Sequence, residues 1–198
     1  MKVKDAKEIH GSLTRTSKMP GLRYSLPAWE CKTGSKLRKV KGSVCSMCYA
    51  VKGNYTRYKA IKAAQYVRLK SLQDSRWIEA MTAQVKRSTY FRWHDAGDVQ
   101  DLNHLNKIYE VCRQTPDTKH WMPTREAWIK DHVSRAPSNL IIRFSMPMID
   151  QEPAGSWSHT STVVTSGASC PAPNQGNECK DCRNCWNKEI KNISYGQH

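Results

Sequence analysis

The stretch TYFRWHDAGDVQDLNHLNKIYEVC, residues 89–112, predicts a strand, a polar turn and a helix in succession. The strand and its turn HDAGD occupy residues 89–98, and Asp101 is well suited to cap the helix that follows. Four residues recur at intervals of three, four and three and so share one helix face: Leu102, Leu105, Tyr109 and Cys112. Cys112 is therefore expected to be a buried core thiol.

The same alternation extends along the chain in both directions. Further strands are expected at four places: residues 22–28, 119–126, 139–148 and 161–166. Helical spacing of apolar residues predicts an amphipathic helix over residues 55–72, a second beginning near Asp74 or Ser75, and a third over residues 126–136. Strands that alternate with helices at short spacing indicate an α/β fold with a mostly parallel sheet.

Ligand sites in such folds gather where the carboxyl ends of the strands open into loops. We therefore expect the loop with Cys45 and Cys48, the turn HDAGD, and the segments PTRE (123–126) and RFSMP (143–147) to surround a single pocket.

Several polar residues near this pocket allow two interpretations. Arg125 and Arg143 are suited to clamp a carboxylate or phosphate, or to pair at the surface with Glu126 or Asp150. His94 alternates with Trp93 on a strand, so one of the two is expected to be buried, and a structural role for His94 competes with proton transfer.

Four cysteines fall within CPAPNQGNECKDCRNCW, residues 170–186: Cys170, Cys179, Cys182 and Cys185. A structural zinc usually takes its ligands as two separated pairs, whereas three cysteines at two-residue spacing are typical of cubane iron–sulfur clusters. An iron–sulfur cluster, [4Fe-4S], is favoured here, with zinc as the alternative and a disulfide as a third interpretation. No stretch near the N-terminus resembles a signal peptide, so the chain is expected in a reducing cytosol, where disulfides are rare.

A second set, Cys31, Cys45 and Cys48, offers three thiolates. Three protein ligands suit a metal or cluster that keeps one position open for a substrate or cofactor. The alternatives are a site completed by one of the terminal cysteines, or ordinary loop thiols.

The formal net charge of +15 is unevenly distributed. Residues 1–87 hold 20 Lys and Arg against 5 Asp and Glu, whereas residues 88–198 hold 12 of each. The excess indicates a nucleic-acid or acidic protein partner for residues 1–87, and the alternative is that lysines simply solvate the outer faces of helices. No segment approaches the roughly 20 apolar residues of a membrane span.

The segments SLPAWECKTGSKLRKVKGSVCSMCYAVKGNY, FRWHDAGDVQDLNHLNKI, MPTRE and CPAPNQGNECKDCRNCW resemble the bacteriophage family called gene product eighty-eight. The likeness covers nearly the whole chain, from about Ser17 to Trp186. It implies a phage protein that acts in the cytoplasm of a bacterial host, and it implies no particular activity.

A more remote resemblance is to radical SAM enzymes, which bind a cluster in the loop after the first strand of a partial (βα) barrel. A turn after their second strand holds S-adenosylmethionine, and here Asp95, Gly97 and Asp98 occupy that place in the order. The cysteine spacing departs from the usual pattern, because Cys31 lies fourteen residues before Cys45.

These likenesses imply a partial barrel of about five strands in residues 1–168, with a cysteine-rich, cluster-binding appendage in residues 169–198. The expected function is that of a phage iron–sulfur protein with one or two clusters. One cluster is expected to keep an open position, so that the protein acts as a radical SAM-like enzyme. The alternative is a basic adaptor that is only held together by its metal sites.

Overall fold

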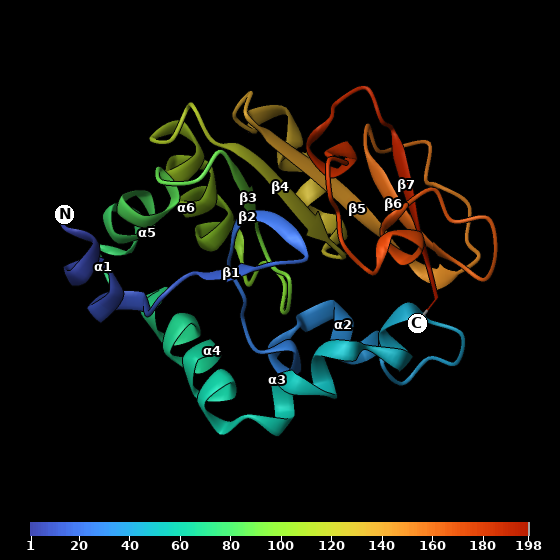
Figure 1. Cartoon of the computed structure of the whole chain (residues 1–198), viewed down its shortest axis with the longest axis horizontal. Coiled ribbons are helices and arrows are strands. Elements are labelled where there is room, and N and C mark those ends of the chain that lie inside the picture. The colour runs from blue at the N-terminus through green and yellow to red at the C-terminus, as the bar shows by residue number, and fades with distance from the viewer. Residues whose placement is uncertain (198) are drawn as a thin grey trace.

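The computed structural model describes residues 1–197 and shows a mixed α/β fold built on one seven-stranded sheet (Figure 1). The strands pair in chain order: β1 (Thr14–Thr16), β2 (Met19–Arg23), β3 (Tyr90–Arg92), β4 (Lys119–Thr124), β5 (Leu140–Ile149), β6 (Thr160–Val164) and β7 (Asn192–Gly196). β1 runs antiparallel to β2, and every later neighbour is parallel. The predicted α/β class and mostly parallel sheet are confirmed.

The sheet has seven strands rather than about five, and it is not closed in the described residues. Five of the strands correspond to the predicted ones. β1 has three residues and β7 emerges from the cysteine-rich tail, so neither carries a long apolar run that would mark it in the sequence.

Six α-helices accompany the sheet in residues 1–197: α1 (Val3–His10), α2 (Lys32–Leu37), α3 (Asn54–Arg57), α4 (Lys59–Ser71), α5 (Trp77–Val85) and α6 (Leu102–Arg113). The helix predicted over residues 55–72 is split, because Tyr58 has an extended backbone between α3 and α4. The helix predicted over residues 126–136 is a 3-10 helix, Ala127–Arg135. No helix in residues 1–197 has the length and apolar character to cross a membrane.

The strand of the opening stretch is shorter than predicted. β3 ends at Arg92, and positive φ angles of 52° at His94 and 79° at Gly97 turn the chain away from the sheet. As a result Trp93 and His94 are both buried, and the expectation that one of them would be exposed is wrong. The helix after the turn is as predicted: the Asp101 carboxylate accepts a hydrogen bond from the His104 N–H at 2.8 Å and caps α6.

The main core fills the space between the sheet and the helices α5 and α6. Its largest fully buried side chains include Trp77 from α5, Trp93 beyond β3 and Tyr24 beyond β2. Cys112 is buried in the same core, as predicted. Figure 1 shows α5 and α6 beside β3 and β4, and α2 and α3 below the strands.

The cysteine-rich segment is the connection between the last two strands. Residues 165–191 leave β6 and return as β7, which pairs with β6 from Thr160 opposite Asn192 to Val164 opposite Gly196 (Figure 1). The predicted boundary between residues 168 and 169 thus falls in a loop between two paired strands.

Candidate metal centres and the adjoining cavity

A cavity of about 460 Å³ lies at the carboxyl ends of the parallel strands. Residues within or just after β3, β4, β5, β6 and β7 line it, and Cys31, Cys45 and Cys48 complete its wall. The loop with these cysteines, the turn HDAGD, and residues of PTRE and RFSMP therefore share one rim, as expected from the order of the elements.

Two tight turns and one helix start hold the three cysteines. Cys31 precedes α2, Cys45 lies in the 3-10 turn Val44–Met47, and Cys48 follows it. Gly34 packs against two of them: a Cβ there would lie 3.0 Å from Cβ of Cys31, which is tighter than ordinary contact, and 3.6 Å from each of the Sγ atoms of Cys31 and Cys45.

Glu126 fixes the start of α2 to the end of β4. Its carboxylate accepts hydrogen bonds from the backbone N–H of Thr33 at 3.0 Å and from the Thr33 hydroxyl at 2.9 Å, and the side chain is buried. The segment next to Cys31 is thereby tied to the rim of the sheet.

Asp95 lies at the cavity with one oxygen satisfied and one free. Its Oδ2 is 3.0 Å from Nε of Arg23 and accepts a hydrogen bond from the Tyr55 hydroxyl at 2.9 Å. The Oδ1 atom is buried and has no partner in the described residues. Tyr49 donates to the backbone carbonyl of Asp95. An unsatisfied buried acceptor beside a cavity is suited to receive a hydrogen bond from a ligand.

Asp98 joins the turn after β3 to the end of β4. Its two oxygens accept from the Thr124 hydroxyl at 2.7 Å and from the Arg125 N–H at 2.8 Å. Burial raises the pKa of Asp98 to about 6, although these hydrogen bonds act in the opposite direction. Gly97 is required between the two aspartates, because a Cβ there would lie 2.5 Å from Cβ of Leu26.

Two arginines and a histidine also line the cavity. Arg92 stacks over the ring of Trp121 at 4.7 Å, and its buried Nε has no partner in residues 1–197. Arg125 donates to the carbonyls of Ser145 and Met146, and the surface pairing with Glu126, one of its two interpretations, is not found in the described residues. Burial holds the pKa of His94 well below its usual value, so its imidazole is neutral.

The first three cysteines line the wall of one cavity. Within residues 1–197 no three His, Cys, Asp or Glu side chains are arranged to hold a single metal ion. Burial, together with the neighbouring thiolates, raises the pKa of Cys31 and Cys45.

The four terminal cysteines form a separate group, and none of them is among the described residues that line this cavity. The backbone N–H of Cys182 donates to the carbonyl of Cys179 at 2.8 Å, and that of Cys170 donates to the carbonyl of Ser194 within β7 at 2.9 Å. Burial raises the pKa of Cys179, and the thiolates of Cys170 and Cys182 add to this. Burial also raises the pKa of Cys185 to about 11.

Arg143 holds the terminal segment in place from within β5. Its guanidinium is buried and donates to five backbone carbonyls, at 2.8–3.4 Å: those of Asn184, Cys185, Asn187, Ile190 and Lys191. Of the two interpretations of Arg143, surface pairing with Asp150 is wrong, since the Asp150 carboxylate accepts from Thr165 instead. In the sequence, the sign that Arg143 has a structural role was its position as a single arginine within an apolar strand.

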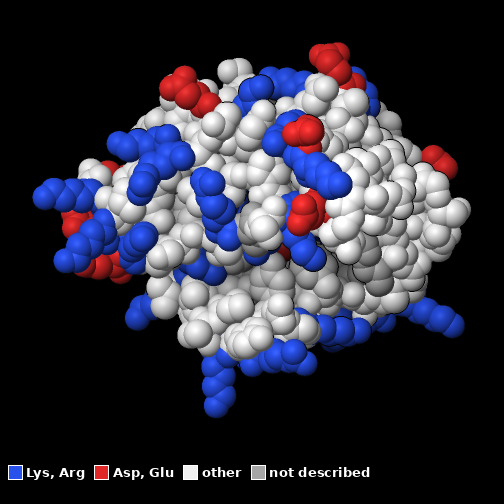
Figure 2. All heavy atoms as spheres, in the orientation of Figure 1, with Lys and Arg blue, Asp and Glu red and all other residues white. Residues whose placement is uncertain are grey.

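The basic half of the chain exposes apolar and aromatic side chains along α4. Tyr58 and Ile61, which the helical spacing assigned to the apolar face, are 50% and 37% exposed. Arg68 lies on the buried face instead and donates to Ser25 and to the carbonyl of Ser12. Figure 2 shows Lys and Arg side chains at the left and along the lower edge of this face, with several acidic groups beside those at the left and the top.

The family model described as Gene product 88 matches residues 2–188 of this chain. Neither the curated proteins nor the solved structures contain a match. The family match agrees with the segments that carry the resemblance in the sequence, whereas the resemblance to radical SAM enzymes receives no support from these comparisons.

Proposed function

Because this chain belongs to the Gene product 88 family, we propose that it is a bacteriophage iron–sulfur protein that acts in the cytoplasm of the bacterial host. In this proposal Cys31, Cys45 and Cys48 hold a cluster with one open position at the cavity. The terminal cysteines hold a second cluster, for which zinc is the alternative.

One observation carries the proposal. Three cysteines and the charged side chains of Arg92, Asp95 and Arg125 line the same cavity of about 460 Å³ at the carboxyl ends of parallel strands. Three thiolates leave one position of a four-site metal group free, and the cavity provides room for a ligand at that position.

The polar groups of the cavity suit a ligand that carries both a cationic and an anionic group. Asp95 offers the free Oδ1 acceptor, and Arg92 offers the free Nε donor. The amino acid portion of S-adenosylmethionine has this character, and Asp95, Gly97 and Asp98 occupy the place in the order of elements that holds it in radical SAM enzymes. A cluster with an open iron would supply one-electron chemistry there, while the protein would bind and orient the ligand and exclude water.

The test is anaerobic purification followed by iron, sulfide and zinc analysis and electron paramagnetic resonance of the reduced protein. About four or eight irons with matching sulfide support one or two cubane clusters. A spectrum that changes on addition of S-adenosylmethionine supports the open site. Stoichiometric zinc without sulfide contradicts the cluster proposal.

Cysteine variants assign the two sites. Cys45→Ala is expected to abolish the spectral change caused by S-adenosylmethionine, with the fold retained. Cys182→Ala is expected to remove metal from the terminal site. Cys112→Ala is the matched control, because that thiol is buried in the main core and is expected to leave the metal content unchanged.

A basic adaptor held together by metal is the second candidate, and the charge of residues 1–87 favours it. Lys62 of α4 lies 4.9 Å from the ring centre of Trp29, Tyr66 is exposed on the same helix, and Tyr58 is exposed just before it. Cationic groups beside aromatic rings are suited to single-stranded nucleic acid. Binding of an oligonucleotide that weakens steeply between 50 and 200 mM salt would support this function, and salt-independent binding or none would contradict it.

A further inference from the structure

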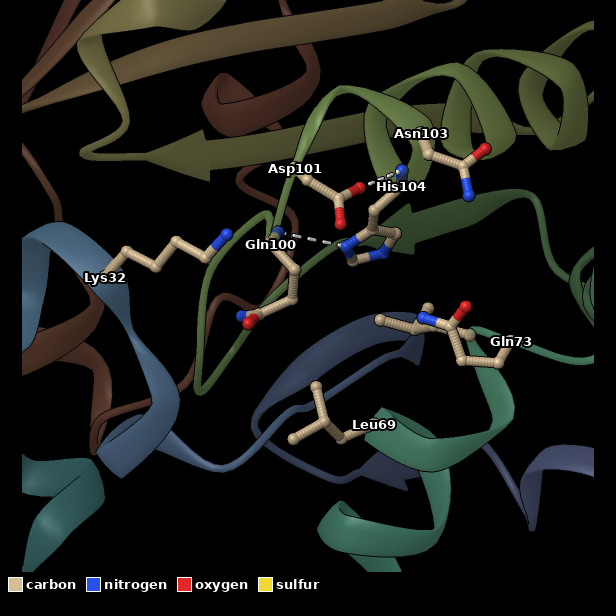
Figure 3. A pocket seen from close by; sticks show the side chains of 8 residues that line it. Lys32, Leu69, Gln73, Gln100, Asp101, Asn103 and His104 are labelled. Carbon is tan, nitrogen blue, oxygen red and sulfur yellow. Dashed lines mark hydrogen bonds between the residues drawn. The ribbon is translucent and has the colours of Figure 1, made fainter.

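A second cavity, of about 220 Å³, lies between the end of α4 and the start of α6 (Figure 3). It shares no lining residue with the cysteine-lined cavity. One water needs only about 15 Å³ of such space, so this cavity has room for a small organic group.

His104 presents an unsatisfied hydrogen-bond donor to this second cavity. Its Nδ1 accepts a hydrogen bond from the Gln100 N–H at 3.2 Å, which places the proton of the neutral ring on Nε2. His104 is only 2% exposed, and its Nε2 has no partner in the described residues. Figure 3 shows the ring edge that carries Nε2 directed toward the space bounded by Leu69 and Gln73. Burial lowers the pKa of His104 to about 3, so the ring remains a neutral donor near pH 7.

The surrounding groups supply both acceptors and donors. Asp101 caps α6 with Oδ1. The Gln100 amide donates to the Asp98 carbonyl, which leaves its own oxygen as an acceptor. The amides of Gln73 and Asn103 line the same space, and each can both donate and accept.

One wall of the second cavity is apolar, and its two charged side chains have opposite signs. Leu69 and Leu72 provide an apolar surface at the end of α4, and Lys32 and Asp101 contribute one charge of each sign. A planar, uncharged ring with amide-like edges matches this combination better than a bare anion or cation.

We propose that the second cavity binds a nucleobase, whose ring lies against Leu69 and Leu72 and whose edge accepts a hydrogen bond from Nε2–H of His104. The amides of Gln73 and Asn103 read the remaining edge, and Lys32 lies where it can meet an attached phosphate. The base belongs either to a free nucleotide or to a single strand bound along the basic half of the chain. This inference does not depend on the cluster proposal.

Isothermal titration calorimetry of the full-length protein tests the proposal. The probes are the four nucleoside 5′-monophosphates, octanucleotides of each single base, and ribose 5-phosphate as the ligand without a base. At least one monophosphate or octanucleotide is expected to bind, and ribose 5-phosphate is expected to bind at least tenfold more weakly. Binding by monophosphates identifies a free nucleotide as the source, and binding by octanucleotides alone identifies a strand.

Variants decide whether binding takes place in this cavity. His104→Ala, Asn103→Ala and Gln73→Ala are each expected to weaken binding about tenfold. Asn103 and Gln73 are exposed, so their replacement leaves the core intact even if His104→Ala fails to fold. Asn106→Ala is the control, since Asn106 is an exposed amide on the same helix outside the cavity.

A direct signal comes from ¹⁵N NMR, in which the Nε2–H resonance of His104 is expected to move downfield on binding. The proposal is overturned if no base-containing probe binds at millimolar concentration, or if ribose 5-phosphate binds equally well. It is also overturned if Asn103→Ala and Gln73→Ala bind as tightly as Asn106→Ala.

Discussion

The hydroxyl of Tyr195 lies 3.5 Å from Sγ of Cys185, and Tyr195 also lines the cavity that contains Cys31, Cys45 and Cys48. One side chain of β7 thus contacts the terminal cysteine group and the cavity of the other group. Arg92 lies at the same junction, because it lines that cavity and its charge favours the thiolates of Cys179 and Cys185.

Tyr195→Phe is expected to lower the reduction potential of a cluster at the terminal cysteines. A hydroxyl that donates to a cysteine sulfur stabilises the more negative, reduced form, so its loss favours the oxidised form. A hydrogen bond of about 0.5–1.5 kcal/mol corresponds to roughly 20–60 mV for one electron. Spectroelectrochemical titration measures the change. Tyr58→Phe is the control, because Tyr58 is exposed just before α4, and an identical potential in both variants would contradict the prediction.

Arg143→Met is expected to loosen residues 184–191 and to destabilise the protein by about 3 kcal/mol or more, because five backbone carbonyls lose the buried side chain that donates to them. Urea unfolding measures the loss, and hydrogen exchange locates it. Arg113→Met is the matched control on an exposed ion pair with Glu110 and is expected to change stability by less than about 1 kcal/mol. Unchanged exchange in residues 184–191 would show that Arg143 does not organise the segment.

Gly97→Ala is expected to displace the turn that carries Asp95 and Asp98. The new Cβ would lie 2.5 Å from Cβ of Leu26 and 2.8 Å from its carbonyl oxygen, in a backbone with φ of 79°. Strain and overpacking together are expected to cost about 2 kcal/mol or more. Gly11→Ala separates the two effects, because Gly11 has φ of 76° and nothing within 4 Å of an added Cβ. Equal losses of unfolding free energy in the two variants would rule out a packing role for Gly97.

Stability is expected to fall as the pH is lowered from 7.5 to 5. Burial lowers the pKa of His104 and of His120 to about 3. The unfolded chain therefore binds protons at these histidines below about pH 6.5, whereas the folded protein does not, and the free energy of unfolding rises with pH across this window. Each such histidine contributes about 2 kcal/mol between pH 7.5 and 5.

Urea unfolding at a series of pH values measures this slope. His120→Gln is expected to reduce the change in unfolding free energy between pH 7.5 and 5 by about 2 kcal/mol, which is the contribution of one histidine. This holds even if the variant is less stable at every pH. Asn106→Ala is the control, because Asn106 is an exposed residue that carries no titratable group, and its slope is expected to match that of the unaltered protein. A slope that is the same in all three proteins would contradict the assignment.

Predictions from the sequence were confirmed where the structure depends on residues that are close together in the chain. The period of apolar residues, the cap at Asp101 and the alternation of strands with helices are local features, and they determined the α/β class and α6. The carboxyl ends of parallel strands lie at one edge of a sheet. The loop of Cys45 and Cys48 was therefore predicted to share a pocket with the turn HDAGD.

Features that depend on distant partners were missed. The apolar face assigned to α4 was wrong because Arg68, with its carbonyl partners at Ser12 and Ser25, competes for the buried position. The burial of both Trp93 and His94 follows from the positive φ of His94, which the alternation of a regular strand does not reveal.

The sequence by itself determined the class of the fold, the spacing of the cysteines and the family, since each of these depends on short stretches of chain. Only the tertiary structure decided that the first three cysteines line a cavity, that the terminal segment returns to the sheet as β7, and that Arg143 binds five of its carbonyls. Those outcomes depend on which distant groups meet when the core closes. A buried guanidinium must find acceptors wherever the fold supplies them, and the sequence does not show where those acceptors lie.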